Sequence, residues 1–257
     1  MTRRVVAAGL GICLLATALP APAQEAGAAA ETDKWSFAIS PYLWAAGLKG
    51  DVATLPPARP ADVDASFHDI LEDLDLALMG IGEVRYGRFA VVADLLYFDI
   101  DDDASTPGPF FSGADLKVKT FIGTVEGSYR ALEAERGYLD LLAGARYWKV
   151  NTEFDLEAGL LAARERDDTK AWVDPVIGAQ GRLNLGAGFH LTAMGNIGGF
   201  GAGSDLTWDV FGGLGYQAAD WFAPVIGYRY LSVDYDKDDF VFDVDLHGPV
   251  IGGVIRF

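Results

Sequence analysis

The segment Gly188–Gln217, GFHLTAMGNIGGFGAGSDLTWDVFGGLGYQ, contains two runs in which apolar and polar side chains alternate. In the second run, 205–217, one face carries Trp208, Val210, Leu214 and Tyr216. The opposite face carries Asp209 and Gln217. A period of two indicates a β-strand with one apolar and one polar face. Only residues 201–204 separate the two runs, so we expect them to be consecutive strands of one sheet.

The same alternation recurs along the chain and predicts ten strands. Their ranges are 35–48, 75–86, 89–101, 114–130, 137–156, 170–184, 188–200, 205–217, 221–235 and 241–257. Short connections at Gly87-Arg88, 131–136, Gly186-Ala187 and 218–220 alternate with longer or more polar ones at 49–74, 102–113, 157–169, 201–204 and 236–240. The sequence therefore predicts an all-β fold, a transmembrane antiparallel up-and-down β-barrel with short periplasmic turns and longer extracellular loops. About ten strands are expected, with eight or twelve as alternatives.

Two predicted strands carry charge on a face that is otherwise apolar. In 114–130, Lys117 and Lys119 share a face with Phe121. In 241–257, the face that ends in apolar Ile251, Ile255 and Phe257 begins with Asp243, Asp245 and His247. Either a β-bulge shifts the phase, near Thr120 and near Gly248-Pro249, or the charged strand ends rise above the bilayer.

The composition suits a membrane barrel. The chain is 51% hydrophobic and 12% aromatic, contains 31 glycines and has a formal net charge of −17. A disordered acidic chain would carry fewer aromatic residues. After residue 23, no uninterrupted apolar run approaches the roughly 18 residues of a membrane-spanning helix. The acidic charge and the lack of a basic stripe exclude a nucleic-acid-binding protein.

The N-terminus has the order of a secretory signal. Arg3 and Arg4 precede the apolar stretch Val5–Leu19, and Ala21-Pro22-Ala23 places small residues before Gln24. Because the stretch is shorter than the roughly 20 residues of a membrane anchor, we expect a signal peptide over 1–23 that is cleaved before Gln24. A short periplasmic segment, 24–34, and the barrel, 35–257, would follow. The single cysteine, Cys13, would leave with the signal, so the mature chain would have no disulfide and no cysteine metal ligand.

Aromatic residues gather near the ends of the predicted strands. Near the periplasmic ends lie Trp35, Phe89, Tyr129, Tyr138, Phe189 and Trp221. Near the other ends lie Trp44, Tyr97, Trp148, Trp172, Trp208 and Tyr230. Amphipathic rings favour the headgroup level, so we expect two girdles. A soluble β-sandwich would also alternate, but charges in the middle of the second face favour a polar lumen.

The polar faces place charged residues of both signs inside the barrel. They are Glu83, Arg85, Asp94, Glu126, Asp140, Arg146, Asp174, Arg182, Asp209 and Arg229, with Gln180, His190 and Asn196 as neutral neighbours. Ten strands lie near the size at which side chains fill the interior. One hypothesis is an ion-pair network that closes the lumen. The other is a narrow pore with a slight cation preference, because carboxylates outnumber guanidiniums.

Two features at the predicted extracellular end are candidates for function. In loop 49–74, Ser66 is expected to cap a short helix with Asp69 three residues on. That helix would either plug the barrel mouth or pack as an amphipathic turn on the rim. Acidic residues also gather at this end: Asp99, Asp101, Asp102, Asp103, Asp236, Asp238, Asp239, Asp243 and Asp245. Their spacing does not match a calcium-binding loop, so no metal site is predicted.

A hydrolase site at the rim is an alternative. Asp243, Asp245 and His247 on one strand, facing Asp99 or Asp101, would imitate the site of ten-stranded outer-membrane proteases. The adjacent Asp-His pair of those proteases is absent. The sequence therefore predicts no catalytic residues.

Five segments carry a resemblance to a known family. They are Ser40-Pro41-Tyr42-Leu43-Trp44-Ala45-Ala46-Gly47-Leu48-Lys49-Gly50, Ser66–Asp75, Glu83–Phe89, Gly227–Leu231 and Ile255-Arg256-Phe257. The chain resembles a family of proteobacterial outer-membrane β-barrel proteins without an assigned activity, loosely similar to the small OmpA- and OmpW-type barrels. The resemblance implies the bacterial outer membrane as location. It also implies that the terminal Phe257 belongs to the signal read by the barrel-insertion machinery.

Taken together, the sequence predicts an integral outer-membrane protein, either structural or a narrow, non-specific channel for small solutes with a partly ion-paired lumen. The alternatives are a protease or lipid-A-modifying hydrolase at the extracellular rim, and a surface receptor or adhesin acting through loops 49–74 and 102–113. The expected partners are outer-membrane lipid, lipopolysaccharide and the insertion machinery. A monomer without cofactor or metal is expected.

Overall fold

The computed structural model describes residues 34–54, 60–104, 111–158 and 164–257. The predicted signal peptide lies outside these ranges. The described residues form strands β1 (Trp35–Trp44), β2 (Gly47–Ala53), β3 (Ala61–Ala65), β4 (Leu74–Tyr86), β5 (Phe89–Ala104), β6 (Phe111–Ala134), β7 (Gly137–Ala158), β8 (Arg164–Gly186), β9 (Phe189–Gly199), β10 (Leu206–Tyr216), β11 (Phe222–Lys237) and β12 (Phe240–Arg256), and helix α1 (Phe67–Glu72). No helix in the described part of the chain is long and apolar enough to cross a membrane.

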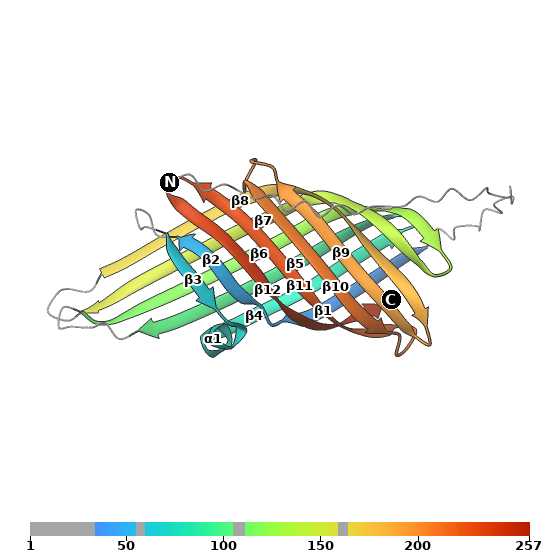
Figure 1. The fold of residues 1–257 in the computed structure, drawn as a ribbon, viewed down its shortest axis with the longest axis horizontal. Helices are drawn as coiled ribbons and strands as arrows, with labels where there is room; N and C mark the ends of the chain where they lie inside the picture. The colour runs from blue at the N-terminus through green and yellow to red at the C-terminus, as the bar shows by residue number, and fades with distance from the viewer. Residues whose placement is uncertain (1–33, 55–59, 105–110, 159–163) are drawn as a thin grey trace, which may run out of the picture. The chain divides into compact units, whose positions relative to one another are not determined.

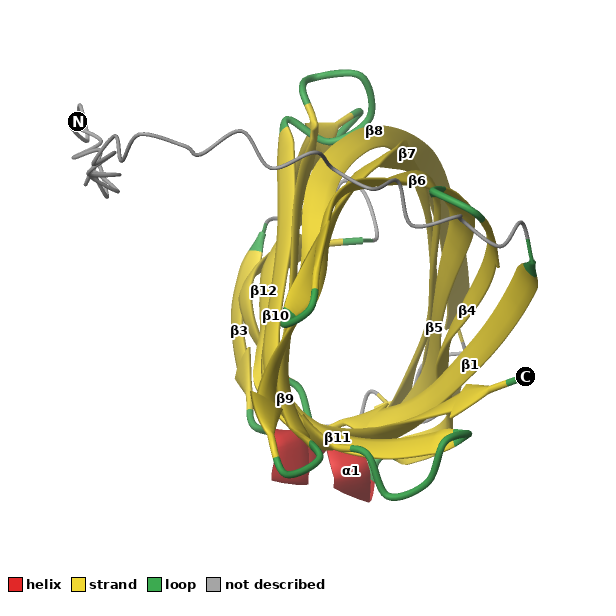
Figure 2. Ribbon diagram, turned by 90° about the vertical axis from the view of Figure 1, so that its right-hand side faces the viewer, coloured by secondary structure: helices red, strands yellow, loops and turns green. Residues whose placement is uncertain are grey.

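Ten strands form a closed antiparallel ring (Figures 1 and 2). Its order is β1-β4-β5-β6-β7-β8-β9-β10-β11-β12, and β12 pairs back to β1. Every connection between neighbouring ring strands follows chain order, so the prediction of a ten-stranded up-and-down barrel is confirmed. Strands β2 and β3 lie outside this ring as an extension that pairs with β12. Two-residue turns join β4 to β5, β6 to β7 and β8 to β9, and this end of the barrel is called the turn end. The opposite end is called the loop end.

The first predicted strand, 35–48, is divided into β1 and β2. Both pair with β12 in one continuous register, and the interruption between them lies opposite Gly248 and Pro249. Pro249 has no N–H to donate to the ladder, although its carbonyl accepts from the Ala45 amide at 2.9 Å. A Cβ atom at Gly248 would overlap the Ala45 carbonyl oxygen, so this close approach requires glycine. The predicted irregularity near Gly248-Pro249 is therefore a gap in pairing without a bulge.

Helix α1 lies within the predicted loop 49–74. As expected, Ser66 caps it: the Ser66 amide donates to the Asp69 carboxylate at 2.8 Å, and the Asp69 amide donates to the Ser66 hydroxyl at 3.4 Å. These hydrogen bonds lower the pKa of Asp69. The helix lies outside the ring of strands (Figure 2), where Phe67 and outward-facing Leu43 and Ile251 line an apolar groove of about 1120 Å³. Of the two alternatives, a plug in the barrel mouth is therefore wrong, because the helix lies outside the ring of strands.

The barrel reverses its polarity along its length. On β12, the outward face is apolar at Ile251, which is 60% exposed, and becomes charged at Asp245 and Asp243 toward the loop end. The inward face over the same loop-end stretch is apolar: Phe240, Phe242, Val244 and Leu246 are all buried. The pairing of β12 with β11 continues without a register shift throughout. The alternation is therefore unbroken while the chemistry of the two faces is exchanged.

Strands β5 and β6 show the same exchange. Lys117 and Asp101 form an ion pair of 2.7 Å on the outer face, and pairing continues without a shift from this level to Phe121. Of the two alternatives, the bulge near Thr120 is therefore wrong, and the charged residues lie on the outer face of an uninterrupted strand pair. A spanning strand needs about 9–11 residues, whereas β6, β7 and β8 have 24, 22 and 23. These strands are long enough to continue well beyond an apolar bilayer.

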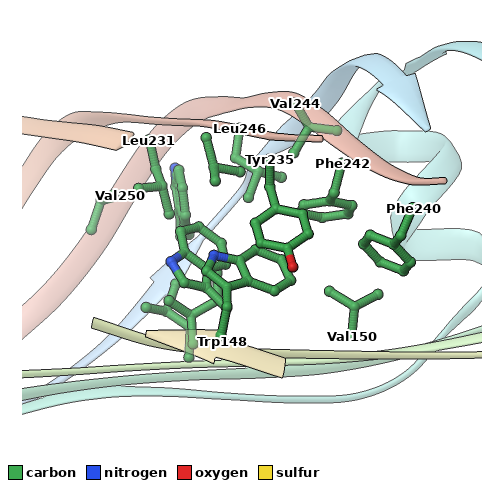
Figure 3. Packing of buried hydrophobic residues seen from close by; sticks show 14 residues of the cluster. Trp148, Val150, Leu231, Tyr235, Phe240, Phe242, Val244, Leu246 and Val250 are labelled. Atoms are coloured by element: carbon green, nitrogen blue, oxygen red, sulfur yellow. The ribbon is translucent and has the colours of Figure 1, made fainter. Parts of the chain in front are cut away.

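An aromatic core fills the loop-end half of the interior (Figure 3). The Trp172 ring stacks on Trp148 at 5.6 Å and on Tyr235 at 4.1 Å between centroids. The predicted girdle positions Trp44, Trp148, Trp172 and Tyr138 are therefore wrong, since these side chains face inward. Trp35, Phe89, Tyr129, Phe189 and Trp221 are exposed, as a girdle requires.

The reversal predicts opposite effects for neighbouring residues of β12. Leu246→Asn places an amide in the aromatic core and should lower the free energy of unfolding by about 2–5 kcal/mol. Asp243→Asn, on the outer face, should change it by no more than about 0.5 kcal/mol. Urea unfolding in detergent micelles, followed by tryptophan fluorescence, measures both. Equal tolerance at the two positions would show that the interior is not apolar at this level.

Candidate functional site

The other half of the interior, toward the turn end, contains most of the charged residues that the sequence predicts for the lumen. Eight of the ten are buried: Arg85, Asp94, Glu126, Asp140, Arg146, Asp174, Asp209 and Arg229. The other two, Glu83 and Arg182, line an internal cavity. Two separate clusters of ion pairs form among them.

The first cluster, called the central layer, is built around Asp209 on β10. Its carboxylate accepts two hydrogen bonds from the Arg229 guanidinium, at 3.0 Å from Nε and 2.7 Å from Nη2. It also accepts one from Arg146 Nη2 at 3.0 Å. A guanidinium that grips both oxygens of a carboxylate forms one of the stronger pairs in proteins. One carboxylate therefore joins β7, β10 and β11 inside the barrel.

Arg229 extends the central layer to the opposite wall. Its Nη2 donates to Asp94 on β5 at 2.6 Å, and its Nη1 donates to the Tyr42 hydroxyl on β1 at 2.7 Å. Tyr42 in turn donates to Asp94 at 2.8 Å. The guanidinium also lies 5.2 Å from the centre of the Trp44 ring, a cation–π distance. Because β5 and β11 are four steps apart in a ring of ten, this side chain crosses the lumen.

Arg146 completes the layer through neutral partners. Its guanidinium donates to the Thr124 hydroxyl at 3.0 Å, the Thr207 hydroxyl at 3.2 Å and the side-chain oxygen of Asn196 at 3.0 Å. Burying an arginine is expensive unless its donors are satisfied. These contacts and Asp209 satisfy all three nitrogens of Arg146.

The second cluster lies nearer the turn end around Asp140. Asp140 accepts from Arg85 at 2.6 Å and from Arg130 at 2.5 Å. Arg85 also donates to Glu83 at 2.9 Å. The Arg130 guanidinium lies 4.0 Å from the centre of the Tyr138 ring. This cluster joins β4, β6 and β7 on one side of the lumen.

Three predicted lumen residues belong to neither cluster. Glu126 is buried, and its Oε1 has no hydrogen-bond partner among the described residues. Asp174 accepts from the Ser204 amide at 2.6 Å and from its hydroxyl at 2.8 Å, so it anchors the β9–β10 loop. Arg182 donates to the amide oxygens of Asn184 and Gln217.

Two members of the clusters, Arg130 and Tyr42, were not predicted from the sequence. Arg130 lies on the same face of β6 as Glu126, so alternation alone could have assigned it. Tyr42 lies on the same face as Trp44, and the assignment of Trp44 to a lipid-facing girdle hid the inward direction of that face. The hydroxyl partners of Arg146 carry no signal in the sequence, because threonine is common on both faces of a strand.

The hydrolase geometry proposed for the rim is not present. His247 faces outward, where its Nδ1 lies 2.8 Å from the Tyr228 hydroxyl and its ring stacks on Tyr230 at 5.4 Å. Asp101 pairs with Lys117 on the outer face of β5–β6, and β5 is not a neighbour of β12. The expectation that His247 and its neighbouring aspartates face Asp99 or Asp101 is therefore wrong. Among the described residues, no cluster of histidine and carboxylate side chains could hold a metal ion.

Comparison with known proteins identifies the fold. No protein-family model and no curated protein matches the sequence. The outer membrane protease OmpT from Escherichia coli matches in structure with a TM-score of 0.54 and 11% identity, over 88% of this chain and 98% of that one. Two weaker matches were also found. The attachment invasion locus protein Ail of Yersinia pestis matches with a TM-score of 0.34 and 15% identity, over 87% of this chain and 98% of that one. The translocator domain of the autotransporter NalP from Neisseria meningitidis matches with a TM-score of 0.42 and 12% identity, over 86% of this chain and 88% of that one. The chain has the fold of bacterial outer-membrane β-barrels.

Asp209 and Glu126 are both buried, but Asp209 accepts hydrogen bonds from two arginines while Glu126 Oε1 has no hydrogen-bond partner among the described residues. Asp209→Asn leaves two buried guanidiniums without their shared carboxylate and should lower the free energy of unfolding by about 3–5 kcal/mol. Glu126→Gln removes a buried carboxylate whose Oε1 has no hydrogen-bond partner, so it should leave stability unchanged or raise it. Urea titration of the two variants at pH 7 is the measurement. A Glu126→Gln loss as large as that of Asp209→Asn would contradict this assignment of partners.

Proposed function

We propose that this protein is an integral outer-membrane protein with a closed lumen, serving a structural role rather than that of a solute channel. The observation that carries this proposal is the position of Arg229. Its guanidinium bonds to groups on β1, β5 and β10 at once, so it occupies the centre of the barrel.

A second obstruction supports the same conclusion. The aromatic core lies in series with the central layer on its loop-end side, and Trp148, Leu96 and Ile122 within it have no exposed surface. A ten-stranded barrel is close to the width that side chains fill. A hydrated solute would have to displace both layers.

The outer surface supports the membrane location. Between the turns and the central layer, the outer surface carries many exposed apolar residues, including Val91, Leu95, Val125, Leu141 and Ile177. Such a band would be costly in water and suits the hydrocarbon region of a bilayer. Short turns lie on the periplasmic side of outer-membrane barrels, so the loop end, with its charged outer face, would project from the cell. Export by a cleaved signal over 1–23 belongs to this proposal.

Conductance in planar bilayers tests the proposal. The refolded wild-type protein should give no stepwise openings, whereas a reconstituted porin in the same bilayers should. Replacing the whole central layer with Asp94→Ser, Arg146→Ser, Asp209→Ser and Arg229→Ser should also give none, because the aromatic core still closes the loop-end half. Folding of this variant is checked by heat-modifiable migration on SDS gels.

Stepwise openings of the wild-type protein would overturn the closed-lumen proposal and favour the narrow channel. Openings only in the serine variant would show that the central layer, and not the aromatic core, is the seal. A chain that migrates identically with and without boiling would count against a folded barrel in the preparation.

A further inference from the structure

The turn-end side of the lumen contains a cavity that the ion-pair clusters do not fill. It has a volume of about 210 Å³ and is lined on one side by Arg182, His190 and Arg256. These residues come from β8, β9 and β12. Three side chains that can carry positive charge therefore converge from three strands at the mouth of the barrel.

The two arginines share one neutral acceptor. Arg182 Nη2 and Arg256 Nη1 donate to the same oxygen, Gln217 Oε1, at 3.1 and 3.2 Å. The Gln217 amide is held in place by its own bond to the Ala219 carbonyl at 2.6 Å. Arg182 Nε donates to the Asn184 side-chain oxygen at 3.0 Å. In the described part of the chain, neither arginine forms an ion pair with a carboxylate.

This arrangement differs from every other arginine cluster in the lumen. Arg85, Arg130, Arg146 and Arg229 each bond to at least one carboxylate. Two guanidiniums that face one amide oxygen repel each other, and the repulsion grows as water is excluded. Glu83 also lines the cavity, but its two oxygens accept from Arg85 and Gln180. The Arg182–Arg256 pair is therefore a local excess of positive charge in a strongly acidic protein.

His190 adds a buried donor or acceptor at the same place. The residue is 2% exposed, and its ring lies close enough to the Gly188 backbone to interact with it. The ring lies against Gly215, where a Cβ atom would overlap it. The imidazole lines the cavity and can donate an N–H to an anion there.

We propose that Arg182, Arg256 and His190 form a binding site for a small anion with carboxylate or phosphate oxygens, entered from the turn end. The planar guanidinium offers paired N–H donors that match such oxygens. The cavity is smaller than the roughly 300 Å³ lower limit of drug-sized pockets, which suits inorganic phosphate or a short dicarboxylate. The site goes beyond the structural role, because it lies on the turn-end side of the central layer and needs no open lumen.

Calorimetric titration of the refolded barrel with potassium phosphate, and separately with succinate, tests the site. The titrations are done at pH 7 in a zwitterionic detergent and at constant ionic strength. These conditions limit nonspecific attraction between the anions and charged surfaces. We expect saturable binding of at least one anion, with an affinity that falls about tenfold or more in the Arg182→Gln, Arg256→Gln double variant. The matched control is Arg136→Gln, which removes an exposed positive charge at the same end of the barrel and should keep the affinity within about twofold.

The relative affinities of phosphate and succinate identify the class of ligand. If the glutamine variant does not refold, the Arg182→Lys, Arg256→Lys variant replaces it, and it should bind more weakly than wild type because lysine lacks the planar fork. Two results would overturn the proposal. One is wild-type protein that binds neither anion, and the other is a double variant that binds as tightly as wild type.

Discussion

The ring of ten strands sets the width of the interior, and the rest of the structure depends on that width. Side chains from opposite walls are close enough to touch, so whatever enters the lumen must be packed or paired. Arg229 shows the consequence, because it reaches Asp94 on one wall while bonding to Asp209 next to its own strand. A wider barrel would leave the same residues lining water. In this one they meet at the centre and close it.

Packing alone would not require charges in the lumen, since an apolar core fills the loop-end half without them. The charges lie where the outer surface is apolar, and the apolar core lies where the outer surface is charged. Each level of the barrel therefore has one polar and one apolar face, but the two are exchanged between its halves. The contact between the Arg229 guanidinium and the Trp44 ring lies at the boundary and joins the two interiors.

The swap of polar and apolar faces between the two halves of the barrel explains which features could be predicted from the sequence. Alternation gave the ten ring strands and the inward faces of Arg85, Asp140 and Asp209, because a period of two needs no knowledge of the surroundings. It could not show which face is buried at the loop end, so Trp148 was assigned to lipid and Asp243 suggested a bulge. The partners of each charge depend on contacts between strands distant in sequence, such as Tyr42 with Arg229. No local pattern records these.

The exchange also fixes the register of the strands. Sliding a strand by one residue turns every side chain to the opposite face. In the half with the apolar exterior, such a slip would turn Asp209 to the apolar outer face and Val210 into the central layer. In the other half, it would put Leu246 into water and Asp245 into the aromatic core. Buried ion pairs contribute little net stability compared with apolar packing, and their best-attested role is to specify one arrangement. The central layer fits that role, because its hydrogen bonds join side chains of β1, β5, β7, β10 and β11 in one network.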